Sequence, residues 1–392
     1  MFFVAACYKG YLLMVVYWNK VTANESRFCP KFASRRHMMK ILKNPILWVV
    51  VLVFFMVAAG YMIMLTTSKQ QEAIKRKIAE KKMVLKQYDL FTMAVKTSPF
   101  EIWAAGSGGM VVRSLDEGKS WEEKQLGSPE VVFSSIHFPD PNHGWLVGTR
   151  STIYNTEDGG KTWNKIDRED NMYLTSVFFA DVQHGWITGE TGTVLLTADG
   201  GKTWETIDTG LFLTTLNDIK FIDQKTGWAV GEQGVVIFSS DGGRTWRNQQ
   251  SGADKSLMSV FPSSANTVWA GGLEGTILLT KDGGKNWQKK VLNFGENTIT
   301  NHVNKMLEQK SGTEGLGHNQ IYALCRGAQQ YSFDGGYSWR PIMMSKESKE
   351  LLSRGFLHDI RFHPEKPELG WMVGKWGVIL HTADVQNWER VF

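Results

Sequence analysis

Short runs of alternating apolar and polar residues recur along residues 89–392. The runs LTSVFFAD at 174–181 and LNDIKFID at 216–223 have the two-residue period of a half-buried β-strand. Each is followed by an apolar run such as GWITG or GWAVG, then by a tight glycine turn and another apolar run. This order predicts several short antiparallel strands, joined by turns, in every unit.

Each unit ends in a box with Ser or Thr, then Asp, usually two glycines, and Trp. The box tryptophans are 42, 41, 42, 41, 52 and 49 residues apart. A period near forty with short strands is typical of a repeat fold. Because each box Trp opens a fourth strand, we expect an all-β, seven-bladed β-propeller of four-stranded blades over residues 89–392. Both ends hold complete blades, so the ring should close without strand exchange. The box aspartates are Asp116, Asp158, Asp199, Asp241, Asp282, Asp334 and Asp384, and the box tryptophans are Trp121, Trp163, Trp204, Trp246, Trp287, Trp339 and Trp388.

The chemistry of the box favours a structural role. Glycines permit the positive φ of a tight hairpin, and the Asp carboxylate can accept backbone N–H groups inside the turn. Each Trp can bury about 150–250 Å² between sheets. Seven copies of a catalytic Asp would serve no reaction, whereas seven copies of a turn staple build seven blades.

The chain before the repeats has a different pattern. The run from Asn44 to Ser68 has no charged residue, and 45–65 is long enough to cross a bilayer. Lysines on both sides disfavour a buried core helix, so 38–68 is predicted to be an uncleaved transmembrane signal anchor. Residues 69–88 are Lys-rich with apolar residues at near-helical spacing. They predict a basic stalk helix or a segment lying on anionic headgroups. Residues 1–37 are expected to be a tail, either disordered or preceding the natural start.

The charge is divided between these two parts. Residues 1–88 carry 15 Lys/Arg against 3 Asp/Glu, whereas the remainder carries 29 against 36. An acidic propeller argues against nucleic acid as a partner.

Basic residues flank the span on both sides, with a slight bias to a cytoplasmic N-terminus. The expected location is therefore the inner (cytoplasmic) membrane, with a single pass and an extracytoplasmic propeller.

Cysteine usage excludes two classes of site. The chain has only Cys7, Cys29 and Cys325, far apart, which predicts neither a disulfide framework nor a zinc site. Cys325 is expected to be a buried free thiol. No metal and no cofactor are expected.

The boxes resemble the Asp-box, or bacterial neuraminidase repeat. The fuller unit, GWxVGxxGxIxxTxDGGKTW, resembles the photosystem II stability/assembly factor family of seven-bladed propellers, over about residues 89–392. The seventh box is one residue short and lacks its glycines, which fits a terminal blade. The resemblance implies a non-catalytic module that docks a membrane-protein complex through a basic patch on one face. Relatives in bacteria without photosynthesis suggest an alternative partner, a membrane transporter to which the chain would be an accessory subunit.

The turns between the second and third strands should carry the docking residues, because they open on one face around the channel. Blades three to five have acidic turns, with Glu190, Glu232 and Glu274. Blades six, seven and two have basic ones, and Trp376 is the one propeller tryptophan that the repeat does not explain. The alternative is that these are ordinary solvated turn charges. The candidate partner-binding residues are Arg150, Arg326, Arg354, Arg361, Lys375 and Trp376.

Two other function classes are compatible with the repeat. A sialidase-like glycoside hydrolase shares the box, but it needs an arginine cluster with a Tyr/Glu pair. The opening blade has no RIP-like segment, and the chain has neither HExxH nor a nucleophile elbow, so we expect no enzyme. A structural scaffold that binds a polysaccharide or a peptide remains the third alternative.

Overall fold

The computed structural model describes residues 88–97, 100–294, 297–298, 301–309, 320–325, 329–352, 356–385 and 387–391. The chain divides into two compact units, 1–81 and 82–392, and these ranges lie in the second. The predicted tail, the span at 45–65 and all of the stalk except Tyr88 lie outside the described residues. Within the described ranges, no helix has the length and apolar character needed to cross a membrane.

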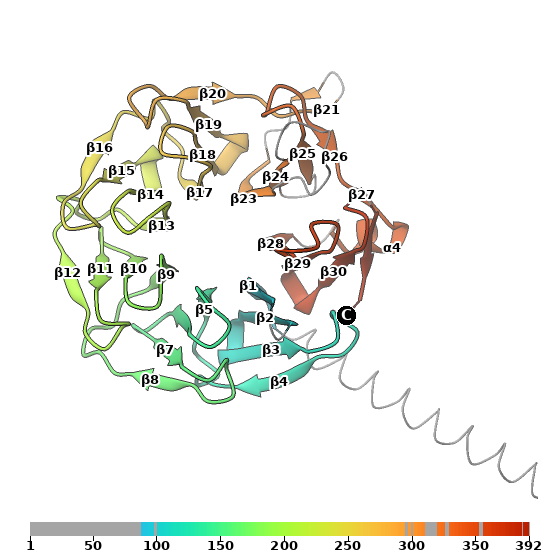
Figure 1. The fold of residues 1–392 in the computed structure, drawn as a ribbon. Coiled ribbons are helices and arrows are strands. Elements are labelled where there is room, and N and C mark those ends of the chain that lie inside the picture. Colours follow the sequence, from blue (N-terminus) through green and yellow to red (C-terminus); the bar gives the residue numbers. More distant parts are fainter. Residues whose placement is uncertain are drawn as a thin grey trace, which may run out of the picture. The chain divides into compact units, whose positions relative to one another are not determined.

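The described residues form seven antiparallel sheets arranged as the blades of a ring (Figure 1). The prediction of a seven-bladed propeller of four-stranded blades is confirmed. The first three blades consist of β1 (Leu90–Thr97), β2 (Phe100–Gly106), β3 (Met110–Ser114) and β4 (Glu122–Gln125); β5 (Phe133–His137), β6 (Gly144–Gly148), β7 (Ile153–Thr156) and β8 (Asn164–Ile166); and β9 (Leu174–Phe179), β10 (Gly185–Gly189), β11 (Val194–Thr197) and β12 (Glu205–Ile207).

The remaining blades repeat this order. They consist of β13 (Leu216–Phe221), β14 (Gly227–Gly231), β15 (Val236–Ser239) and β16 (Arg247–Gln249); β17 (Leu257–Pro262), β18 (Val268–Gly272), β19 (Ile277–Thr280) and β20 (Gln288–Lys290); β23 (Val303–Gln309), β24 (Gln320–Cys325), β25 (Gln330–Ser332) and β26 (Arg340–Pro341); and β28 (Leu357–Phe362), β29 (Gly370–Gly374), β30 (Ile379–Thr382) and β31 (Asn387–Arg390). The first strand of each blade lies nearest the axis (Figure 1).

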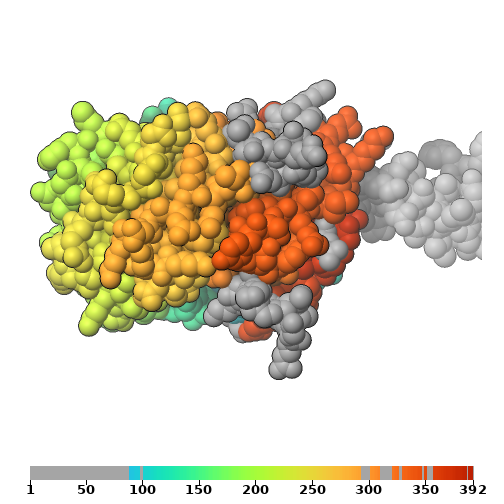
Figure 2. Space-filling view, turned by 90° about the horizontal axis from the view of Figure 1, so that it is seen from above, coloured from blue at the N-terminus to red at the C-terminus, as the bar shows by residue number. Residues whose placement is uncertain are grey.

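The longer intervals in blades six and seven correspond to additional elements. A two-stranded hairpin, β21 (Asn293–Phe294) and β22 (Asn297–Thr298), precedes blade six. Strand β27 (Met343–Met344) pairs in parallel with β31 and gives blade seven a fifth strand, and α4 (Lys346–Leu352) follows it. In the space-filling view of Figure 2, successive blades follow one another around the rim of the ring from green through yellow and orange to red.

A bulge in every innermost strand creates a belt of polar side chains around the axis. The register shifts between the first and third residues of each strand, as between Leu216 and Asp218. A bulge leaves backbone groups unpaired within its own sheet, so these need partners elsewhere. Side chains of the neighbouring blades supply several of them. We define the belt as these third residues: Thr92, Ser135, Ser176, Asp218, Ser259, Lys305 and Asp359.

Tryptophans of the second strands fill the space between blades. Trp186 of β10 is fully buried and stacks on Phe221 of the next blade, with ring centroids 3.6 Å apart. Its Nε1–H donates to the carbonyl of Gly242, at 2.8 Å. A Cβ on Gly243 would lie 2.5 Å from that nitrogen, so this box glycine is required for close approach as well as for its φ of +84°.

The box aspartates stabilise the turns between the third and fourth strands through hydrogen bonds. Asp199 accepts the backbone N–H of Thr203 at 3.0 Å and its hydroxyl at 2.6 Å. Thr197 donates its hydroxyl to Asp199 at 2.8 Å and accepts the N–H of Gly201. The Thr203 hydroxyl and N–H bonds lower the pKa of Asp199 to about 2. The glycine-poor seventh box keeps the turn, because Val385 adopts a φ of +61° and Asn387 donates to Asp384.

Candidate functional site

The turns between the second and third strands meet at one end of the ring, which we call the turn face. The innermost strands begin there, because Leu357 pairs with Gly374, next to the turn at 375–377. The boxes lie at the opposite end, since Gly370 pairs with both Phe362 and Thr382. A residue's position along an innermost strand therefore gives its depth between the two faces.

Lys375 and Trp376 are consecutive residues in the turn of blade seven, and this turn lies at the seam between blades seven and one. Trp376 occupies the left-handed region with φ of +57°, and its N–H donates to the Asp89 carboxylate at 2.8 Å. Its side chain is 38% exposed. The Lys375 ammonium lies 5.6 Å from the Trp376 ring centroid and 5.2 Å from that of Phe356. An indole and an ammonium group are thus held side by side on the turn face.

The seam carries two charged groups, the Lys375 ammonium and the Asp89 carboxylate that accepts the Trp376 N–H. Lys375 forms no ion pair with any described residue. Burial lowers the pKa of the neighbouring His358 to about 4, which leaves that imidazole neutral at pH 7.

The other described candidate residues are not part of this cluster. Arg150 lies on the turn face of blade two, in a left-handed conformation, and is ion-paired with Glu130. Arg361 lies near the box end of β28, where it lines the central channel and binds Asp359 at 2.6 Å. The structure therefore places Arg361 inside the ring, at the end opposite Lys375.

Arg326 and Arg354 lie outside the described residues. The helix α4, in the connection between blades six and seven, was missed by the sequence reasoning. Ser345 was the available signal: it precedes a run of good helix formers, and its hydroxyl accepts the N–H of Ser348 at 3.2 Å.

The acidic turns of blades three and four have local structural roles. Glu190 accepts the backbone N–H of Tyr173 at 3.0 Å, and Glu232 accepts that of Thr215 at 2.9 Å. Each carboxylate thereby fastens the start of an innermost strand to its own blade's turn. Glu274, in blade five, pairs with Lys255 at 3.3 Å.

Of the charged residues of the channel, sequence reasoning named only Arg361. Aligning LNDIKF and LHDIRF with LTSVFF would have shown Asp218 and Asp359 at a position where blades two, three and five carry serine. No group of three or more His, Cys, Asp or Glu within the described part of the chain is placed to hold a metal ion.

Comparison with known families agrees with the fold. The model described as "Photosynthesis system II assembly factor YCF48" matches residues 125–213 and 211–294, and a BNR/Asp-box repeat model matches 330–341. Among curated proteins, the chain is 41% identical over 76 residues to the chloroplastic photosystem II stability/assembly factor HCF136 of Cyanidioschyzon merolae, covering 17% of each chain. It is 52% identical over 46 residues to the photosystem II assembly lipoprotein Ycf48 of Synechocystis sp., covering 12% of this chain and 13% of that one. These alignments span less than a fifth of the relatives' length.

Solved propellers resemble the whole ring. A structure of YCF48 bound to D1 peptide aligns with a TM-score of 0.59 and 18% identity, covering 75% of this chain and 93% of that chain. YCF48 from Cyanidioschyzon merolae aligns at 0.57 and 16% identity, covering 75% and 95%. At this identity the likeness concerns the fold alone.

Taken together, the family model over residues 125–294, the Asp-box repeats and the seven-bladed ring make the chain similar to the photosystem II stability/assembly factors. The curated relatives are named as assembly or stability factors, in agreement with the expectation of a non-enzymatic protein.

Proposed function

We propose that this chain is a membrane-anchored, non-catalytic assembly factor whose turn face docks a subunit of a membrane-protein complex. The relatives named as assembly factors, and the related propeller with a bound D1 peptide, support this class of function. The observation that carries the proposal is the exposed Trp376, held beside Lys375 at the seam.

The geometry of Trp376 is unfavourable unless the side chain is used. A left-handed conformation is rare for a bulky residue and costs on the order of 1–3 kcal/mol. Apolar surface exposed to water adds to that cost. Tryptophan is among the side chains enriched at the energetic centres of protein interfaces. An apolar side chain flanked by a carboxylate would complement this pair on the partner.

The test compares two substitutions at equivalent turn positions. Trp376→Gly removes the indole while keeping a residue suited to positive φ. Gln233→Gly makes the same change in blade four, where φ is +56°. The full chain is purified in mild detergent, and integral membrane subunits recovered in stoichiometric amount are identified by mass spectrometry.

The docking proposal predicts that Gln233→Gly retains the membrane subunit and that Trp376→Gly loses most of it. Lys375→Gln should weaken recovery and make it less sensitive to salt. Equal recovery with wild type and Trp376→Gly would show that docking occurs elsewhere. The identity of the subunit decides between a photosystem and a transporter.

The anchor forms a separate part of the proposal. We propose that residues 45–65 hold the chain in the inner membrane with the propeller on the extracytoplasmic side, because this segment has no charge over a bilayer's thickness. Deleting 45–65 should release the chain from the membrane fraction. In sealed spheroplasts, added protease should reach the propeller. Full protection would show that the propeller lies on the cytoplasmic side.

A further inference from the structure

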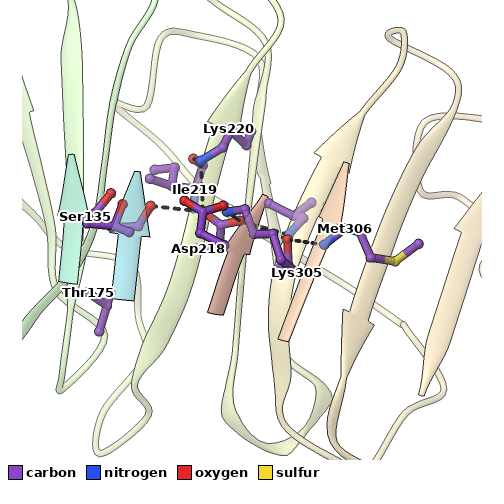
Figure 3. A network of polar contacts seen from close by, with 12 residues as sticks. Ser135, Thr175, Asp218, Ile219, Lys220, Lys305 and Met306 are labelled. Carbon is purple, nitrogen blue, oxygen red and sulfur yellow. Dashed lines mark hydrogen bonds and ion pairs between the residues drawn. The ribbon is translucent and has the colours of Figure 1, made fainter. Parts of the chain in front are cut away.

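The axis of the propeller contains a polar cavity that the docking proposal does not use. The seven innermost strands enclose about 290 Å³, and the lining side chains come from every blade. Figure 3 shows part of this network, in which Asp218 lies between Lys220 and Lys305. Backbone amides and hydroxyl groups of neighbouring strands converge on the same level of the channel.

Asp218 is fully engaged by this network. Its Oδ1 accepts from the Ser176 hydroxyl at 2.9 Å, the Ile219 N–H at 3.1 Å and the Lys220 ammonium at 2.9 Å. Its Oδ2 accepts from Ser259, Val260 and Lys305, at 3.2–3.3 Å. Two lysines thus share one carboxylate.

Asp359 takes the corresponding position in blade seven. It accepts the Ile360 N–H at 2.9 Å and the Arg361 Nη1–H at 2.6 Å through Oδ1, and the Met93 N–H at 3.0 Å through Oδ2. Arg361 also donates from Nη1 to the Ile360 carbonyl. Among the described contacts Arg361 uses only Nη1, so its Nη2 and Nε donors remain for a ligand.

The charges of the channel do not balance. The ionised side chains among its described lining residues are Asp218, Asp359, Lys220, Lys305 and Arg361. Burial together with the charges of Lys220 and Arg361 lowers the pKa of His137 to about 3, and burial lowers that of His358 to about 4. Both imidazoles are therefore neutral at pH 7, and one positive charge is left without a counter-charge.

This excess charge lies where solvent access is restricted. The side chains of Lys220, Lys305 and Arg361 are only 20%, 16% and 25% exposed. Burial, opposed by Asp218 and reinforced by Lys305 and Arg361, lowers the pKa of Lys220 to about 8. An uncompensated charge in such a place is costly, and a bound anion would remove that cost.

We infer that the central channel is a binding site for a small oxyanion, a carboxylate or phosphate group held between Lys220 and Arg361. Both residues occupy the fifth position of their innermost strands, so they lie at one level near the box end. The guanidinium supplies paired donors that match two oxygens of such a group, and the ammonium supplies a point charge. A cavity of 290 Å³ is at the lower end of ligand pockets and suits a small anion.

The test uses calorimetric titration of the full chain in non-ionic detergent, with citrate and with inorganic phosphate as separate probes at constant ionic strength. Lys220→Gln makes the channel neutral and leaves Asp218 paired with Lys305 and both serines. Lys289→Gln changes the net charge equally, but lies exposed on the outermost strand β20. We expect Lys220→Gln to weaken binding at least about tenfold, and Lys289→Gln to change it less than about twofold.

A second measurement needs no substitution. With ¹³C-methylated lysines, the NMR titration of Lys220 should move to higher pH when the anion is present, because a nearby negative charge favours the ammonium form. Binding of citrate alone would assign a carboxylate, and binding of phosphate alone a phosphate. The inference is overturned if neither anion binds at millimolar concentration, if both lysine variants bind as wild type does, or if both weaken equally.

Discussion

The carboxylate of Asp359 in blade seven accepts a hydrogen bond from the backbone N–H of Met93 in blade one, at 3.0 Å across 266 positions of the chain. Asp218 makes the same contact to Val260, and Thr92 makes it to Ile136. A hydrogen bond from a backbone N–H to a belt side chain of the preceding blade therefore joins blade one to blade seven, as it joins other neighbouring blades. The first and last blades remain separate sheets.

Asp359→Ala should destabilise the propeller strongly. The substitution leaves the Met93 N–H and the Arg361 guanidinium without their buried partner, which costs about 3–5 kcal/mol in comparable pairs. Urea unfolding followed by tryptophan fluorescence measures the change. Asp254→Ala, at a carboxylate that is 87% exposed, is the control and should stay within about 0.5 kcal/mol. A loss below about 1 kcal/mol for Asp359→Ala would show that packing alone closes the ring.

Tryptophans of the repeat and of the turn face should differ in their contribution to stability. Trp186→Ala removes a fully buried indole stacked on Phe221, and should lower the free energy of unfolding by about 3–5 kcal/mol. Trp376→Gly removes a side chain that is 38% exposed and relieves a positive φ, so we expect little change or a gain. Thermal unfolding compares the two variants. Equal destabilisation would contradict a docking role for Trp376.

The box carboxylates should make stability fall in strong acid. The Thr203 hydroxyl and N–H bonds lower the pKa of Asp199 to about 2, from an ordinary value of 3.8. Since the folded pKa is the lower one, the stabilisation is present above pH 4 and is lost as the pH falls toward 2. NMR titration of the Asp199 carboxyl measures the shift. Thr203→Val removes one donor and should return the pKa toward 3.8, whereas an unchanged value would assign the shift to another cause.

Cys325 should be unreactive in the folded protein. Its side chain is 2% exposed, and burial raises the pKa of the thiol to about 12. The thiolate is the reactive form, so labelling requires opening of blade six. In a Cys7→Ser/Cys29→Ser chain, a thiol reagent should modify Cys325 about a hundredfold more slowly under native conditions than in denaturant. Rapid labelling in the native state would show that this blade opens locally.

The sequence alone determined the blades. Spacing of the box tryptophans predicted seven units, and the alternating runs predicted four strands in each, because a hairpin depends on residues close along the chain. The roles of Thr197, Asp199 and Thr203 could be expected from the turn for the same reason. The seventh box has no glycine, and there Val385 adopts the positive φ that the turn requires.

Only the tertiary structure decided which side chains meet between blades. Arg361 is near Lys375 in sequence, yet β28 and β29 carry the two residues to opposite ends of blade seven. Asp218 and Lys305 belong to blades four and six and meet only because the ring brings their strands to one level. The parallel pairing of β27 with β31 likewise joins the connection after blade six to the last strand. Short-range patterns specify hairpins, whereas contacts across the axis depend on how many blades close the ring and at what height each strand lies.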